Sequence, residues 1–280
     1  MASELRFKSL KMSEKLSLQR CLSYRKRILD LSQRVTAMHI APAFSCLEIV
    51  DTIYHDLMRK GESASSFEDI FVLSKGHGCM AQYVVLESLG ILSTDDLNKY
   101  CTPQGRIGGH PDYGVSGIEA STGSLGHGLS IALGMCYGEK IKGSEKVVYV
   151  VLGDGEMQEG SVWEAMMMAP NLVSKNMVAF IDLNNYQGLG KTSVTHPNFY
   201  PIVDKCEAFG WETYEIKGHS NQEIKKAVNN RSGKKPTMII CNTVKGKGVD
   251  FMIDQPIWHY RSPSVDEYNH AISNLREVSS

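Results

Sequence analysis

No segment of the 280-residue chain contains an apolar run close to the roughly 20 residues that a membrane helix needs. The formal net charge is only −1, so the chain does not carry the basic excess that is typical of nucleic-acid-binding surfaces. Residues 1–15 contain no apolar core like that of a signal peptide. We therefore expect a cytoplasmic protein that binds neither a membrane nor nucleic acid.

Cysteine patterning and nucleotide-binding fingerprints are also missing. The seven cysteines are scattered without a C-x-x-C pair, which favours reduced thiols over a disulfide framework or a zinc site. No G-x-G-x-x-G follows an expected strand, and no G-x-x-x-x-G-K-[ST] occurs. A cofactor that carries phosphate would therefore need a different kind of binding site.

Apolar segments alternate with amphipathic segments along most of the chain. We expect strands within "DIFVLSKGHG" and at 146–152, 177–183, 211–217 and 237–244, and helices over 13–34, 45–60, 79–90, 129–142, 161–174 and 220–230. Apolar strands that alternate with helices predict an α/β fold with a parallel sheet covered on both faces. Because no repeat or linker is visible, we expect a single domain over 1–280, whose last part, 245–280, is irregular and then helical.

A glycine-rich segment spans residues 101–128 and contains His110 and His127. It is long for a simple connection in a compact domain, and ordered loops of this length are usually functional. Glycine also allows the backbone to approach a ligand closely. The alternative is a flexible surface loop.

Polar side chains follow two consecutive expected strands. Asp154 lies in "GDG" after 146–152, and Asn184 follows 177–183. A strand–helix–strand crossover places both residues at the carboxyl edge of a parallel sheet, where ligands bind in open α/β folds. A carboxylate and an amide oxygen, with a backbone carbonyl, suit Mg²⁺ that also binds phosphate oxygens and water.

The residues after Asp154 favour an anion at this edge. Gly155 would leave room for a diphosphate beside a helix start, where free N–H groups attract anions, and Ser161 and Glu164 have the spacing of a capping box. Taken singly, Asp154 could be a helix N-cap and Asn184 a turn residue. Their joint position after consecutive strands favours the metal–diphosphate interpretation.

The stretch "GDGEMQEGSVWEA…FIDLNNYQGLG" resembles the thiamine diphosphate motif, which begins with GDG and ends with N or NN about thirty residues later. Further stretches narrow the resemblance to the transketolase family. They are "VLSKGHGCMAQY" (72–83), "GGHPDYGVSGIEASTGSLGHGLSIALGM" (108–135), "VVLGDGEMQEG" (150–160) and "NTVKGKGV…WHY" (242–260). The matches run in order from about residue 20 to residue 260.

The resemblance implies transfer of a two-carbon ketol unit from a ketose phosphate to an aldose, with thiamine diphosphate and Mg²⁺, or Ca²⁺ or Mn²⁺, as cofactors. The chain is only about as long as the diphosphate-binding domain of a full transketolase. It therefore resembles the N-terminal subunit of a two-chain transketolase, with the pyrimidine-binding domain on a partner chain in an α2β2 heterotetramer. The family's glutamate that activates the aminopyrimidine would lie on the partner, so this chain by itself would be nearly inactive.

The resemblance also implies residue roles. The metal would bind Asp154, Asn184 and the backbone carbonyl of Tyr186. Cofactor contacts would come from His77, Gly123, Ser124, Leu125, Gly155, Asn184 and His259. The catalytic histidines would be His39, His110 and His259, which contact substrate or cofactor and steer protons. Glu159 and Glu164 match carboxylates at the family's subunit contact.

Other charged residues stay outside the predicted site. We interpret His55, His196, His219 and His270 as exposed polar residues. Lys245 and Lys247 could contact phosphate or belong to a solvated loop.

One stretch departs from the family pattern. Where the family has a "GHIGGSLS"-like sequence, this chain has "MHIAPAFSC" (38–46), so Ala41 and Pro42 replace two glycines after His39. The added bulk and the fixed φ of proline reshape a loop at the substrate channel, which predicts a variant donor or acceptor sugar. Two alternatives remain, namely the α subunit of a 2-oxo-acid dehydrogenase and a non-catalytic scaffold protein. The "KGHG", "GGHPD" and "KGKG" stretches argue against the first, and intact Asp154 and Asn184 argue against the second.

Overall fold

A parallel five-stranded sheet lies at the centre of the computed structural model, which describes residues 2–63, 66–172, 174–188 and 190–277. The strand order is β1-β2-β3-β7-β6, with all neighbours parallel. The strands are β1 (Ile70–Leu73), β2 (Val148–Gly153), β3 (Met177–Leu183), β6 (Glu212–Lys217) and β7 (Thr237–Asn242). A small antiparallel pair, β4 (Tyr186–Gln187) and β5 (Gly190–Lys191), follows β3.

Side-chain alternation along the central strands divides the interior into two apolar cores. In β2, Tyr149 and Val151 enter one core, whereas Val148, Val150 and Leu152 enter the other. Successive side chains of a strand point to opposite faces, so a strand buried on both faces must be apolar at every position. The edge strand β6 is more polar and only partly buried. The predicted α/β class is therefore confirmed.

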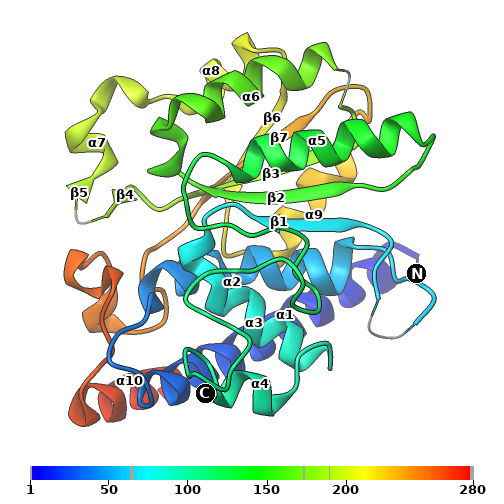
Figure 1. The fold of residues 1–280 in the computed structure, drawn as a ribbon. Helices are drawn as coiled ribbons and strands as arrows, with labels where there is room; N and C mark the ends of the chain where they lie inside the picture. Colours follow the sequence, from blue (N-terminus) through cyan, green and yellow to red (C-terminus); the bar gives the residue numbers. More distant parts are fainter. Residues whose placement is uncertain (1, 64–65, 173, 189, 278–280) are drawn as a thin grey trace.

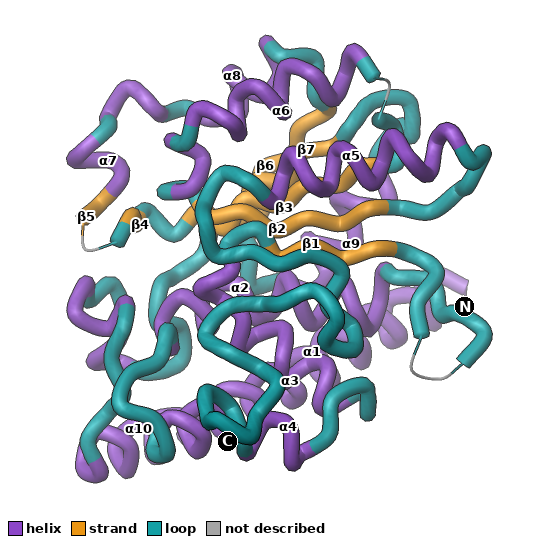
Figure 2. The backbone as a smooth tube through the Cα atoms, in the orientation of Figure 1, coloured by secondary structure: helices purple, strands orange, loops and turns teal. Residues whose placement is uncertain are grey.

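Helices cover both faces of the sheet (Figures 1 and 2). One face carries α5 (Gly128–Ile141), α6 (Gly160–Asn171) and α8 (Ile202–Ala208). The other carries α1 (Ala2–Ser32), α2 (Ile40–Thr52), α3 (Cys79–Ser88), α9 (Asn221–Asn230) and α10 (Val265–Glu277). Short helices lie at α4 (Thr94–Asn98), α7 (Thr192–Thr195), Ile53–Leu57, Gly76–Gly78, Glu156–Gln158, Pro197–Phe199, Asp250–Met252 and Pro256–His259. No helix among the described residues combines the length and the apolar character that crossing a membrane requires.

Several local predictions differ from the structure. The helix predicted at 13–34 begins at Ala2 and ends at Ser32. The helix predicted at 45–60 begins at Ile40, because Pro42 lies in the first turn, where a backbone N–H has no intrahelical acceptor. The capping box is wrong, because α6 begins after Glu159 and the Ser161 hydroxyl donates to the Gly126 carbonyl at 2.8 Å instead. A tertiary contact with the glycine-rich segment thus outweighs the local pattern.

The crossover from β2 through α6 to β3 sets the position of the predicted metal ligands. Gly153 of β2 is in register with Asp182 of β3, and the backbone N–H of Asp154 donates to the Asp182 carbonyl at 3.3 Å. Asp154 and Asn184 therefore both lie just beyond the carboxyl edge of the sheet, as the sequence predicts.

The glycine-rich segment 101–128 is fastened to the strands and helices beside it. The Tyr83 hydroxyl donates to the His110 carbonyl at 2.8 Å, and the Thr122 hydroxyl donates to the carbonyl of Leu73, the last residue of β1, at 2.7 Å. These contacts hold the segment across the end of β1, in agreement with an ordered loop.

Candidate active site

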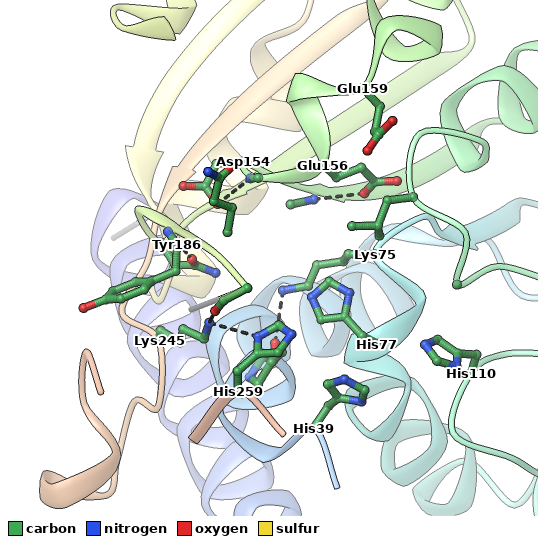
Figure 3. A pocket seen from close by; sticks show the side chains of 18 residues that line it. His39, Lys75, His77, His110, Asp154, Glu156, Glu159, Tyr186, Lys245 and His259 are labelled. Atoms are coloured by element: carbon green, nitrogen blue, oxygen red, sulfur yellow. Dashed lines mark hydrogen bonds between the residues drawn. The ribbon is translucent and has the colours of Figure 1, made fainter. Parts of the chain in front are cut away.

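A cavity of about 390 Å³ lies at the carboxyl edge of β1, β2 and β3. Figure 3 shows the side chains that line it. Every predicted site residue lines this cavity except Ser124, which is exposed and lies outside the lining. The lining residues are His39, Pro42, Lys75, His77, His110, Gly123, Leu125, Gly153, Asp154, Gly155, Glu156, Glu159, Asn184, Tyr186, Gln187, Gly188, Lys245 and His259.

Asp154 is a buried carboxylate without a cation beside it. Its oxygens accept hydrogen bonds from the Thr192 hydroxyl at 3.1 Å and from the Gly155 N–H at 2.9 Å. Within the described ranges it forms no salt bridge. Burial, followed by the nearby charge of Asp182, raises the pKa of Asp154 to about 7. A group in this state fits a divalent cation, because the cation would supply the missing positive charge.

Asn184 and Tyr186 line the same cavity as Asp154. Asn185 between them adopts a φ of 66°, a left-handed conformation that asparagine tolerates, and this turns the chain after β3. The Asn184 amide oxygen accepts the Tyr186 N–H at 3.0 Å. No group of three or more His, Cys, Asp or Glu among the described residues could hold a metal. A cation here would therefore depend on amide and carbonyl oxygens as well as on Asp154, which is the donor chemistry that Mg²⁺ accepts.

Gly155 is needed for close packing of two loops. A Cβ at this position would lie 2.7 Å from the Cβ of Gln187 and 3.2 Å from the Tyr186 carbonyl oxygen. The glycine thus brings the Tyr186 carbonyl close to Asp154. This is a more specific reason than the room for a diphosphate that the sequence suggests.

Four histidines from distant parts of the chain meet at the other side of the cavity (Figure 3). Ring centroids are 5.6 Å apart for His39 and His77, 5.8 Å for His39 and His110, and 5.3 Å for His39 and His259. Burial lowers the pKa of His39 to about 4 and that of His259 to about 3, and it lowers the pKa of His77 well below its ordinary value. Neutral imidazole can both donate and accept a hydrogen bond.

The glycine-rich segment places His110 beside this group. Gly123 has a φ of 141°, and a Cβ on it would lie 2.8 Å from the His110 ring. Glu156 holds the same segment, because its carboxylate accepts from the Ser74 hydroxyl at 2.5 Å and from the N–H groups of Gly126 and Gly153 at 3.0 and 3.2 Å. Burial raises the pKa of Glu156.

Lys245 belongs to the cavity, although the sequence pattern alone did not assign it to the site. Its ammonium lies 3.1 Å from His259 Nδ1 and 3.3 Å from the Gly188 carbonyl oxygen. Burial lowers the pKa of Lys245 to about 8. Lys247 is exposed and does not line the cavity. The "KGKG" stretch indicates that a lysine could contact phosphate. Which of its two lysines faces the cavity becomes clear only in the folded chain.

The sequence pattern also gives no indication of a buried ion pair between Lys75 and Asp182. The Lys75 ammonium contacts the Asp182 carboxylate and donates to the Pro42 carbonyl at 3.1 Å. Burial would lower the pKa of Lys75, but Asp182 raises it above its ordinary value. Burial would raise the pKa of Asp182, but Lys75 holds it below its ordinary value. Asp182 lies inside an apolar strand, where its charge gives no indication of its partner.

The four histidines that are predicted to be exposed polar residues fall into two groups. His196 and His270 are exposed, as predicted. His219 is partly buried, with Nδ1 2.8 Å from Glu48 and Nε2 accepting the Val244 N–H at 2.9 Å, so the prediction of an exposed residue is wrong. His55 is also partly buried and lies 3.1 Å from the Tyr24 hydroxyl.

The two glutamates assigned to a subunit contact point outward. Glu159 lies at the rim of the cavity, and Glu164 lies on the exposed side of α6. Both are therefore accessible in the isolated chain.

Comparison with known proteins identifies the family of the chain. Residues 19–259 match the family described as transketolase, thiamine diphosphate binding domain. The chain is 37% identical over 260 residues to an apulose-4-phosphate transketolase subunit of Phocaeicola vulgatus, covering 90% of this chain and 91% of the relative. It is 33% identical to the 6-deoxy-6-sulfo-D-fructose transketolase subunit SqwG of Clostridium sp., covering 90% of this chain and 94% of the relative.

Solved transketolases have the same fold but are longer. The Campylobacter jejuni enzyme superimposes with a TM-score of 0.84 at 25% identity, covering 93% of this chain and 43% of that protein. The Leishmania mexicana enzyme has the same TM-score at 24% identity, with 41% of its length covered. This chain thus spans about two fifths of these enzymes, whereas it spans most of the two relatives that are named as subunits. The chain belongs to the transketolase family, and its residues 19–259 correspond to the thiamine diphosphate-binding domain of that family.

Proposed function

We propose that this chain is the diphosphate-binding subunit of a two-chain transketolase that moves a two-carbon ketol unit from a ketose phosphate to an aldose. One observation carries the proposal. In a member of this family, a buried carboxylate without a cation, Asp154, and four histidines, three of them with lowered pKa values, line the same cavity.

The oxygen-rich side would hold the metal and the diphosphate. Asp154, Asn184 and the Tyr186 carbonyl would bind a divalent cation, Mg²⁺ or alternatively Ca²⁺ or Mn²⁺. Gly155, His77 and His259 would contact the diphosphate, and Gly123, Ser124 and Leu125 would face the aminopyrimidine. When bound, thiamine diphosphate supplies a thiazolium that acts as the electron sink for cleavage beside a carbonyl.

The histidine side would bind and orient the sugar. The imidazole rings of His39, His110 and His259 can, in the neutral form, donate to a sugar oxygen and accept a hydroxyl proton. The depressed pKa values of His39 and His259 support this role, since a protonated imidazole could not accept. His110 lies on the fastened glycine-rich segment, so its ring is held at the cavity wall.

A second chain would complete the site. The relatives are named as one subunit of their enzymes, which supports a partner chain, and the outward-facing Glu159 and Glu164 support its contact near the cavity rim. We propose an α2β2 heterotetramer in which residues 1–280 form one diphosphate-binding domain. The seven free cysteines support a reducing compartment such as the cytoplasm.

The sugar would differ from that of ordinary transketolases. Pro42 of "MHIAPAFSC" lines the cavity, whereas Ala41 packs in the apolar core. Relatives are named for apulose 4-phosphate and for 6-deoxy-6-sulfo-D-fructose, which supports variation of the sugar among separate subunits. A competition assay across ketose donors tests this point, and a preference for xylulose 5-phosphate over the other donors would contradict it.

Calorimetric titration with thiamine diphosphate and Mg²⁺, followed by a ketol-transfer assay with and without the co-expressed partner, tests the function. We expect binding that depends on Mg²⁺ and transfer only with the partner. Binding without transfer in the complete assembly would favour a non-catalytic scaffold. Robust transfer by the single chain would contradict the requirement for a partner.

A further inference from the structure

The amide of Asn184 has a hydrogen-bonding environment that distinguishes its oxygen from its nitrogen. Nδ2 donates to Asp182 Oδ2 at 3.1 Å and to Ser45 Oγ at 3.0 Å, whereas Oδ1 accepts the Tyr186 N–H at 3.0 Å. The carboxylate can only accept, and the backbone N–H can only donate. All three contacts therefore require the same orientation of the amide.

Ser45 is an acceptor because its own proton is used elsewhere. Its hydroxyl lies 2.6 and 2.8 Å from the two oxygens of Asp182, to which it donates. The lone pairs of Oγ are then left for Asn184. Asp182 and Ser45 are both fully buried, so no bulk water competes for these contacts.

We propose that Asp182 and Ser45 are positioning residues that fix the Asn184 amide with its oxygen toward the cavity and thereby set the affinity for the divalent cation. The inference rests on the proposed function. Neither residue lines the cavity, so both act through Asn184. A reversed amide would point its NH₂ group at the cation and its oxygen at the Asp182 carboxylate, and both contacts are repulsive.

Lys75 keeps this arrangement electrically balanced. Its buried ammonium contacts Asp182 and is itself held by the Pro42 carbonyl at 3.1 Å. Asp182 also accepts from the Thr243 hydroxyl, which lies 3.3 Å from Ser45 Oγ and makes no hydrogen bond to Asn184. Thr243 thus offers a matched control, because it contacts the same carboxylate and Ser45 but makes no direct contact with the Asn184 amide.

The test compares Ser45→Ala, Asp182→Asn and Thr243→Val in the full chain. Mg²⁺ affinity is measured by calorimetry at saturating thiamine diphosphate, and folding is checked by the thermal unfolding of the ligand-free protein. Loss of a group that orients a metal ligand typically lowers metal affinity about 10–100-fold. We expect such a loss for Ser45→Ala and Asp182→Asn, with cofactor binding restored by excess Mg²⁺, and no comparable loss for Thr243→Val.

If Asp182→Asn fails to fold, the Mg²⁺ affinity of Ser45→Ala alone tests the proposal, because this variant leaves the Lys75–Asp182 pair intact. Wild-type Mg²⁺ affinity in folded Ser45→Ala overturns this inference alone. An equal loss in Thr243→Val also overturns it, because the effect would then be general damage to the buried cluster. Absence of Mg²⁺-dependent cofactor binding in the wild type overturns the proposed function and this inference with it.

Discussion

Two buried clusters of charge in this chain have opposite electrostatics. In the first, which we call the paired cluster, Glu48 of α2 lies 2.7 Å from Arg25 and 2.8 Å from His219. Burial would raise the pKa of Glu48, but these partners lower it to about 2. In the second, the cavity cluster, burial raises the pKa of Asp154 to about 7 and lowers that of Lys245 to about 8.

The difference between these clusters suggests two roles for buried charge. We expect the charges of the paired cluster to stabilise the fold and those of the cavity cluster to bind a ligand. The paired cluster contains its own counter-ions, so its contribution is to hold α1, α2 and the loop after β6 together. In the cavity cluster, Asp154 forms no ion pair with any described residue, although Lys75 and Lys245 lie near enough to interact with it, and a buried charge without a close partner is costly. Such a cost is compensated when a ligand of opposite charge binds, so we expect substitutions in the two clusters to have different effects.

The largest expected effect is the loss of cofactor binding in Asp154→Ala. Removing a metal ligand should weaken Mg²⁺-dependent binding of thiamine diphosphate by more than about 100-fold, which exceeds the usual effect of a supporting residue. The ligand-free protein should unfold at the same temperature as the wild type or higher, because a buried unpaired charge is removed. Calorimetry and thermal unfolding measure both effects. A folded variant that still binds normally would remove Asp154 from the cavity cluster's function.

The reverse pattern is expected for Glu48→Gln. This change leaves Arg25 buried without its carboxylate, which should lower the free energy of unfolding by about 3 kcal/mol. Affinity for thiamine diphosphate should stay near the wild-type value. Urea denaturation and calorimetry test the pair of effects. Glu68→Gln is the control, because the exposed Glu68–Arg59 pair should contribute less than about 1 kcal/mol.

The paired cluster should also have a defined pH dependence. The pKa of Glu48 is about 2 in the folded chain and 4.5 ordinarily, so its stabilising contribution is complete above about pH 4.5 and is lost as the pH falls toward 2. The difference in unfolding free energy between wild type and Glu48→Gln should therefore shrink over this interval. Denaturation at a series of pH values measures it, and a difference that stays constant would show that Glu48 is not the titrating group.

The smallest expected effect distinguishes the two lysines of "KGKG". Lys245→Met should weaken binding of thiamine diphosphate about tenfold, the usual order for one charge-assisted contact. Lys247→Met should have no effect, since Lys247 is exposed outside the cavity. Because burial lowers the pKa of Lys245 to about 8, wild-type affinity should also fall as the pH rises through 8. Equal effects of the two substitutions would mean that Lys245 is not specific to the cavity.

The sequence predicts which residues lie at the carboxyl edge of the sheet, but it does not predict the buried side-chain contacts beneath that edge. Asp154 and Asn184 follow from strand order, because one crossover joins β2 and β3. Asp182 could not be identified in this way, since its partner Lys75 is 107 positions away and the strand around it is apolar.

Local patterns also fail where distant residues compete for the same group. The Ser161 hydroxyl bonds Gly126 rather than the start of its own helix. His219 resembled a surface residue because Glu48 is 171 positions away along the chain. The histidines of the cavity were assigned through the family resemblance, not from spacing, and the structure brings these particular four rings together.

The two sides of the cavity differ in how far apart their residues lie in the sequence. Asp154 and Asn184 belong to one strand–helix–strand unit, so their juxtaposition requires only that this unit form. His39 and His259 come from near opposite ends of the sequence, and their rings meet only after both ends have packed against the centre. The side with Asp154 and Asn184 therefore depends on one local strand–helix–strand unit, whereas the imidazole side depends on the packing of segments that are distant in the sequence.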